Sequence, residues 1–284
     1  MAEPLIRNVS DTARWVAAYR ERETLLPDPL FRDALAGRLA GDRGRAIAAQ
    51  ASPHTAWALV TRTKVIDDLV LQAVADGADC VLSLAAGFDT RPYRLLLPPE
   101  LRWIEADLPA LIAEKEELLR DEKPVCRLSR EAVDLADPLA RAAFLKRVTA
   151  SSRRVLVITE GLVMYLDAAV VADLAASLAA EPAIFRWVLD FSSPVILKMA
   201  SDAMADRLAS APFKFAPEDG LGFFERHGWK EGEAISLIRK AGQFDRLPNW
   251  VMRLLARLPQ PVPRSAKGRW SIVARLERTA PAKR

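Results

Sequence analysis

Short apolar segments alternate with longer amphipathic ones from residue 80 to the C-terminal part of the chain. The short segments have the length and composition of β-strands, and they are Cys80–Leu84, Arg102–Ala106, Val125–Leu128, Arg154–Thr159, Ile184–Phe191, Phe244–Leu247 and Trp270–Leu276. Strands that alternate with helices predict an α/β fold, in which helices cover both faces of a mainly parallel sheet of seven strands. The last segment alternates apolar and polar residues, which is typical of an antiparallel edge strand.

The residues before the first strand predict a helical arm, residues 1–52. Two short amphipathic helices, residues 11–26 and 29–40, are expected around a pair of prolines. A third helix is expected to begin at Ser52-Pro53, a favourable N-cap followed by proline, and to end near Asp76 before Gly77. An arginine, Arg62, lies on the apolar stripe of that helix, where a charged residue is unusual.

An insert, residues 192–230, follows the fifth predicted strand and is rich in aromatic residues and methionine. Two interpretations remain open, because such residues either form a lid over an apolar pocket or belong to the core. The arm and the insert are treated as parts of one domain, residues 1–284.

Composition and charge restrict the possible functions. The chain has 284 residues, of which 51% are hydrophobic and 27% are charged, as in an ordinary globular protein. The net charge of +4 is spread evenly, so no nucleic-acid partner is expected. No signal peptide or membrane-spanning run is recognisable, which favours a cytoplasmic protein without a membrane partner. Cys80 and Cys126 belong to no metal-binding motif, so neither a disulfide nor a metal site is expected. The oligomeric state is open.

The stretch CVLSLAAGFDTRPYRL contains a turn of small residues directly after the first strand. Ligands of open parallel sheets bind at the carboxyl ends of the strands, and small residues there allow a close approach to the backbone. The positions of a dinucleotide-binding G-x-G-x-x-G motif are occupied by Ala85, Gly87 and Thr90, and a phosphate-binding Walker loop is absent. A nucleoside ligand without phosphate, such as S-adenosylmethionine, is therefore favoured.

Acidic residues follow the next strands. Asp107 lies twenty positions after Gly87, where a carboxylate can accept hydrogen bonds from ribose hydroxyls, although it could also cap the following helix. Asp134-Leu135 follows the third strand, where they could meet an adenine ring. Glu160 ends a very apolar strand, and a carboxylate in such a place needs a partner.

These stretches resemble the leucine carboxyl methyltransferase family, in particular its bacterial branch of S-adenosylmethionine-dependent methyltransferases that includes polyketide O-methyltransferases. The similar segments are LSLAAGFDTRPYRL, IEADLP, AVDLAD, ITEGLVMYL and FFERHGW, preceded by TARWVAAYRERETLLPDPLFRDALAG and RTKVIDD. The resemblance implies a Rossmann-like class I methyltransferase fold and transfer of a methyl group to an oxygen of a small molecule or peptide end, and we expect this oxygen to belong to a carboxylate.

The resemblance also implies roles for individual residues. The cofactor-binding residues would be Arg62, Ala85, Gly87, Asp107, Asp134, Leu135 and Glu160, and the substrate-binding residues would be Tyr165, Phe213, Phe215 and Phe223. Among them, Arg62 would pair with the carboxylate of S-adenosylmethionine and Glu160 would contact its amino-acid end. Ala85 replaces a glycine that is usual in the family, and we expect a negative φ there, at which a methyl group is harmless.

No catalytic residue is predicted, because methyl transfer to an ionised carboxylate needs alignment of the reactants rather than a general base. His227 would be the candidate base for a phenol acceptor, but a structural role is favoured. Two alternatives remain. The strand-turn-acid pattern also occurs in nicotinamide-dependent oxidoreductases, and the fold could bind S-adenosylmethionine without transferring its methyl group.

Overall fold

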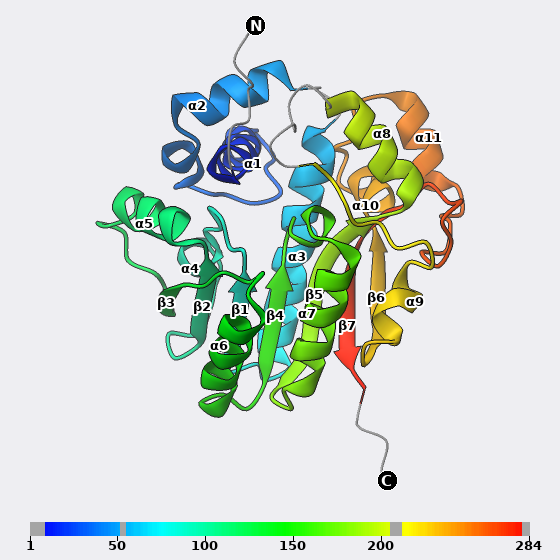
Figure 1. Ribbon diagram of the computed structural model, residues 1–284. Coiled ribbons are helices and arrows are strands. Elements are labelled where there is room, and N and C mark those ends of the chain that lie inside the picture. The colour runs from blue at the N-terminus through cyan, green and yellow to red at the C-terminus, as the bar shows by residue number, and fades with distance from the viewer. Residues whose placement is uncertain (1–8, 52–54, 205–211, 280–284) are drawn as a thin grey trace, which may run out of the picture.

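The computed structural model describes residues 9–51, 55–204 and 212–279. Its centre is a seven-stranded sheet with the order β3-β2-β1-β4-β5-β7-β6 (Figure 1). The strands are β1 (Cys80–Leu84), β2 (Arg102–Asp107), β3 (Arg127–Ala132), β4 (Val155–Thr159), β5 (Ile184–Ser192), β6 (Trp229–Ser236) and β7 (Ser271–Arg278). The first five strands are parallel, and β7 is antiparallel to both of its neighbours, β5 and β6. The prediction of a mainly parallel sheet with an antiparallel last strand is confirmed, but β7 lies between β5 and β6 and is not the edge strand that we expected.

Helices cover both faces of this sheet, and the described ones are α1 (Val9–Thr24), α2 (Ala36–Gln50), α3 (Ala56–Ala75), α4 (Arg91–Arg94), α5 (Pro109–Leu118), α6 (Pro138–Ala150), the 3-10 turn η1 (Val163–Tyr165), α7 (Ala168–Ala180), α8 (Pro194–Met204), α9 (Leu221–Glu225), α10 (Leu237–Gln243) and α11 (Trp250–Arg257). Because side chains alternate along a strand, β1 directs Leu82 and Leu84 to the face that α6 and α7 cover. It directs Val81 to the opposite face, where it meets α3.

The N-terminal arm consists of α1 and α2, which pack on each other above the strand ends (Figure 1). Their contact is close, since a Cβ at Gly44 would come within 2.5 Å of the carbonyl oxygen of Arg14. The second arm helix lies later than predicted, at Ala36–Gln50 instead of 29–40, and Gly41 interrupts it with a φ of 55°. Arg246 from the C-terminal part holds the arm through a 3.0 Å ion pair with Glu23.

Helix α3 ends as predicted. Its last residue is Ala75, and Gly77 follows with a φ of 90°, a conformation that favours glycine. The predicted start at Ser52-Pro53 lies outside the described residues.

Two strand predictions need correction, and both concern the edges of the sheet. Residues 244–247 form a turn after α10 rather than a strand, while the sixth strand is Trp229–Ser236, which was not among the predicted strands. The third strand occupies 127–132 instead of 125–128. Both edge strands expose charged side chains, which protect a sheet edge but remove the apolar pattern that identifies a strand.

Cys80 and Cys126 are buried free thiols. Within the described ranges, no helix is both long enough and apolar enough to span a bilayer.

Candidate functional site

A cavity of about 510 Å³ lies at the carboxyl ends of β1, β2, β4 and β5, and α1 and α3 form its other walls. Its size is in the range usual for small-molecule sites. All of the predicted cofactor residues line it, namely Arg62, Ala85, Gly87, Asp107, Asp134, Leu135 and Glu160. The fold therefore brings together residues that lie up to 98 positions apart in the sequence.

The turn after β1 corrects our expectation for Ala85. Its φ is +53°, in the left-handed region, and not negative. Gly87 has a φ of +49° in the same turn. A non-glycine residue with this φ costs on the order of 1–2 kcal/mol, so Ala85 is strained where the family usually has glycine.

Asp107, at the end of β2, ties this turn to the start of α5. Its Oδ2 accepts a 2.7 Å hydrogen bond from the backbone N–H of Gly87, and its Oδ1 accepts a 2.8 Å bond from that of Leu108. Burial raises the pKa of the Asp107 carboxyl, although the two N–H groups act in the opposite direction. The carboxylate thus has a structural role and also faces the cavity.

Asp134 and Leu135 lie in the loop after β3. The Asp134 carboxylate accepts a 2.9 Å hydrogen bond from the N–H of Ala136, which fixes the turn. The side chain of Leu135 packs against the core and contributes an apolar wall to the cavity.

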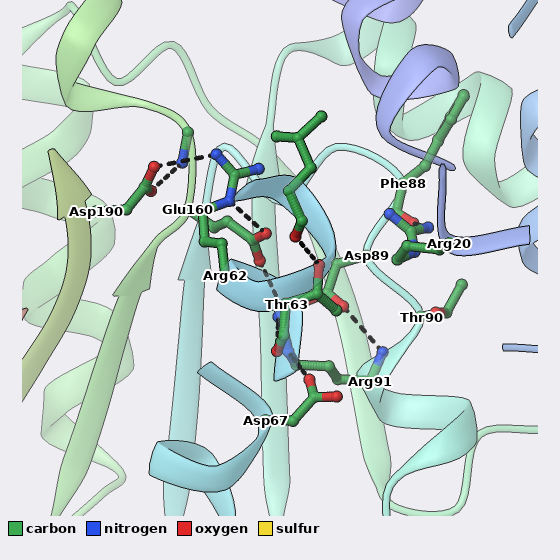
Figure 2. A network of polar contacts seen from close by, with 12 residues as sticks. Arg20, Arg62, Thr63, Asp67, Phe88, Asp89, Thr90, Arg91, Glu160 and Asp190 are labelled. Atoms are coloured by element: carbon green, nitrogen blue, oxygen red, sulfur yellow. Dashed lines mark hydrogen bonds and ion pairs between the residues drawn. The ribbon is translucent and has the colours of Figure 1, made fainter. Parts of the chain in front are cut away.

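Arg62 of α3 lies between two carboxylates from neighbouring strand ends (Figure 2). Its Nε donates to Glu160 at 2.9 Å, and its Nη1 is 3.0 Å from Asp190 at the end of β5. Asp190 also accepts a 2.6 Å bond from the N–H of Gly161. Although burial opposes the charge, both carboxylates raise the pKa of Arg62, so this guanidinium is a permanent cation.

Gly161 is required for this arrangement in two ways. Its φ is +65°, and a Cβ there would lie 3.3 Å from Nη1 of Arg62. A larger residue would therefore strain the backbone and press on the guanidinium.

Glu160 also pairs with Arg91, at 2.8 Å, which extends the network along the loop after β1 (Figure 2). Arg91 in turn binds Asp89 at 2.9 Å and Asp67 at 2.7 Å. Burial raises the pKa of Glu160, but Arg91 and Arg62 outweigh it and the pKa is lowered. Glu160 is therefore ionised at neutral pH.

The complete network connects the cavity to the arm through further pairs. Its described members are Arg20, Arg62, Arg91 and Arg94, together with Asp33, Asp67, Asp89, Glu160 and Asp190. Four guanidinium groups thus face five carboxylates. When all are ionised, the cluster has one excess negative charge.

Seven of these nine residues were not predicted as site residues from the sequence, namely Arg20, Asp33, Asp67, Asp89, Arg91, Arg94 and Asp190. The signal for Asp190 was the same as for Glu160, a carboxylate at the end of an apolar strand. Asp89 and Arg91 stand in the stretch FDTRPYR, which we used to recognise the turn but not to assign ion pairs. All of the seven except Asp33 and Asp67 line the cavity.

The outer part of the cavity is apolar. Tyr165 and Phe213 line it, with ring centroids 5.3 Å apart, and Ile196 and Leu197 of α8 face it. Burial raises the pKa of Tyr165 to about 12. Part of the predicted insert therefore does cover the cavity.

The other aromatic residues of the insert do not line this cavity. Phe215 is buried in the core and Phe223 packs against it, with the two ring centroids 4.9 Å apart. The structure therefore places these two predicted substrate residues in core packing and outside the lining of this cavity. His227 packs on Phe223 at 5.1 Å and is also absent from the lining.

The comparisons with known proteins agree with one another. The family model of leucine carboxyl methyltransferase matches residues 13–179. A Frankia alni protein named "putative S-adenosyl-L-methionine-dependent methyltransferase" is 33% identical over 250 residues, which cover 83% of this chain and 87% of the relative. A Streptomyces coelicolor protein of the same description is 33% identical over 251 residues, with the same coverage of 83% and 87%.

Solved structures show the same fold. A Thermobifida fusca protein described as a methyltransferase superimposes with a TM-score of 0.61 at 15% identity, over 97% of this chain and 96% of that one. A DUF574 family protein from Streptomyces avermitilis has a TM-score of 0.51 at 14% identity, over 93% and 97%.

Proposed function

We propose, from the premise that this chain belongs to the leucine carboxyl methyltransferase family, that it transfers the methyl group of S-adenosylmethionine to an oxygen of a small molecule or peptide end, most simply a carboxylate oxygen. We also propose that the protein is cytoplasmic and acts in secondary metabolism. The observation that carries it is the cavity lining, which joins a charged part to an apolar part and, among the described residues, includes no histidine, lysine or cysteine.

The charged inner part fits the cofactor. S-adenosylmethionine supplies a methyl group on a positively charged sulfur, which is a good leaving group. Arg62 retains its Nη2 for a ligand carboxylate, while Glu160 is placed for a ligand amino group. Asp107 is the candidate for the ribose hydroxyls. The excess negative charge of the network favours a cationic ligand over an anionic dinucleotide.

The outer part supports an acceptor that is already ionised. None of the described lining residues is histidine, lysine or cysteine, and Tyr165, with a pKa of about 12, holds its proton at neutral pH. The carboxylates of the network are engaged by arginines. A carboxylic acid ionises without help, whereas a phenol needs a base near neutral pKa. The residues of this chain then have to align the acceptor and exclude water.

The cofactor is tested by calorimetric titration of the purified protein with S-adenosylhomocysteine, with NADH as the comparison ligand. One-site binding of S-adenosylhomocysteine alone is expected. Binding of NADH alone would replace the proposal with the oxidoreductase alternative.

The acceptor atom is tested by incubation with methyl-labelled S-adenosylmethionine and matched sets of apolar carboxylic acids and phenols. Methyl esters release labelled methanol in mild alkali, but aryl methyl ethers do not. Alkali-labile product supports a carboxylate acceptor, and alkali-stable product contradicts it. Cofactor binding without any methylated product would favour a protein that binds S-adenosylmethionine without transferring its methyl group.

A further inference from the structure

Helix α11 directs its apolar side away from the protein. Trp250 is 75% exposed, Leu254 53% and Leu258, the residue after the helix, 48%. These three residues lie on one face of the helix because they are spaced by four positions. Val251 and Leu255 are also exposed and widen this face. We call these five residues the α11 face.

The α11 face is not needed to attach the helix. Ala256 and Met252 point inward, where they join a small cluster with Ala241 of α10 and Leu247. Asn249 caps the helix by accepting a 3.0 Å hydrogen bond from the N–H of Met252. The helix is thus held from one side only, and it lies at the outer edge of the molecule (Figure 1).

The charges around the α11 face are predominantly basic. Residues 246–276 contain seven basic residues and no acidic one. Arg253 and Arg257 belong to α11 itself and are exposed. Arg257, Lys267 and Arg269 have no ion-pair partner within the described part of the chain, and Arg253 has one exposed pair, with Asp245 at 3.3 Å. This surface therefore favours an anionic partner.

We propose that the α11 face binds the surface of an anionic lipid membrane. A helix with an apolar face of tryptophan and leucine, flanked by arginines, has the composition of helices that lie in the membrane interface. Tryptophan favours the level of the headgroups, and each basic residue near an anionic surface adds attraction. The absence of a membrane-spanning run does not argue against this, because such a helix lies on the bilayer.

Other occupants fit less well. In a two-fold dimer the same face of each copy would meet, which would place Arg253 and Arg257 next to their own copies. An acidic protein would satisfy the charges, but it would need a groove shaped for the protruding side chains, whereas lipid receives them without a fixed shape.

Membrane contact would have a use for the enzyme, if the proposed function is correct. Helix α10, on which α11 packs, contributes Leu237 to the cavity lining. A protein attached through α11 would hold its apolar acceptor chamber near the bilayer, where apolar carboxylic acids accumulate.

Sedimentation with vesicles tests the proposal. The full chain is mixed with vesicles of phosphatidylcholine alone, or with vesicles of equimolar phosphatidylcholine and phosphatidylglycerol, without cofactor or acceptor. We expect binding to the anionic vesicles only, weakened by added salt. Because no ligand is present, the result is independent of the methyltransferase proposal.

Three variants locate the contact. Leu254→Asp with Leu258→Asp is expected to weaken anionic vesicle binding by about tenfold or more, because two apolar contacts are replaced by charges. Arg253→Gln with Arg257→Gln should weaken it by about fivefold for each arginine. The matched control, Leu96→Asp with Leu139→Asp, changes two leucines that are 95% and 82% exposed elsewhere, and should bind as the unaltered chain does.

Circular dichroism and binding of S-adenosylhomocysteine show whether each variant is folded. No binding of the unaltered chain to anionic vesicles would overturn the proposal, and so would equal losses in the α11 and control variants. Equal binding to both vesicle types would show that the arginines do not contribute and would contradict the proposed preference for an anionic membrane. A dimer in sedimentation velocity that the leucine variant abolishes, without vesicle binding, would assign the face to a second copy instead.

Discussion

Helices α3 and α11 both depart from the usual arrangement of apolar residues inside and charged residues outside, but in opposite directions. Helix α3 buries Arg62 and Asp67, and every one of these charges has a partner at ion-pair distance. Helix α11 exposes Trp250 and Leu254, which have no apolar cluster to join in the described chain. The buried charges of α3 suit a site for a small ligand, whereas the exposed apolar residues of α11 suit a surface for a much larger partner such as a membrane.

The largest effect is expected when Arg62 of α3 is replaced. Arg62→Leu leaves Asp190 buried without its cation and Glu160 with Arg91 alone, so we expect the free energy of unfolding to fall by about 3–5 kcal/mol. Affinity for S-adenosylhomocysteine should also fall. Urea denaturation and calorimetry measure the two effects.

The matched control for this variant is Lys64→Ala on the same helix. Lys64 forms an exposed pair with Asp68, so its removal should change stability by less than about 1 kcal/mol. If Arg62→Leu were equally harmless, the network would not be the support that we describe.

The next largest effect is expected from acidification, which protonates carboxylates of the ion-pair network around α3. Burial raises the pKa of Asp89, but Arg91 and Lys115 outweigh this and hold it at about 2, below the usual 3.8. A lowered pKa means that the stabilisation is complete above pH 4 and is lost as the pH falls towards 2. The loss is expected to be about 2 kcal/mol. Asp89→Asn should flatten the dependence of urea midpoints on pH, while Asp68→Asn, with its exposed carboxyl, should leave it unchanged.

Asp107→Asn changes the turn after β1 and the candidate ribose-binding group together. An amide has one oxygen and cannot accept bonds from both Gly87 and Leu108 while also facing a ribose. Affinity for S-adenosylhomocysteine should fall by about tenfold or more, measured by calorimetry. Unchanged affinity in the folded variant would remove Asp107 from the cofactor site.

A smaller gain is expected from Ala85→Gly. Glycine removes the cost of a φ of +53°, which exceeds the entropy that glycine loses on folding, so stability should rise by about 0.5–1 kcal/mol. Thermal unfolding measures the gain. A loss of stability instead would mean that the methyl group of Ala85 contributes packing that outweighs the strain.

The smallest effect should come from the α11 face. Leu254→Asp is expected to change the free energy of unfolding by no more than about 0.5 kcal/mol, because the side chain is exposed. Met252→Asp is the matched variant on the inward face of the same helix. It places a charge in the small cluster with α10 and should clearly lower the free energy of unfolding in the same urea assay. If both variants were equally destabilising, the α11 face would be part of the fold and the comparison with α3 would fail.

Much of the fold follows from local sequence. β1 and β4 are mostly apolar because both faces of each strand are buried. A ligand of such a sheet is expected to bind at the carboxyl ends of these strands. This is why Gly87, Asp107 and Glu160 could be placed correctly in one cavity. The bounds of β3 were predicted wrongly and β6 was missed, because each lies at an edge and carries exposed charges.

The rest depends on tertiary contacts. The sequence marks Arg62 as unusual, but only the packing of α3 against β4 and β5 brings Glu160 and Asp190 to it. The φ of Ala85 is set by the turn rather than by its own preference. Phe213 and Phe215 are two positions apart and similar in kind, yet one lines the cavity and the other enters the core.

The ion pair between Arg246 and Glu23 has a consequence for the order of events during biosynthesis. The two residues are 223 positions apart, so the pair cannot form until most of the chain has left the ribosome. Closing so long a loop is entropically costly and slows folding. Nascent α1 and α2 can pack on each other early and can contact the turn after β1 and α5 through Arg20 and Arg14, but their contact with the C-terminal part forms only after α10 has been translated. The enclosed ligand chamber is therefore among the last parts of the molecule to be completed.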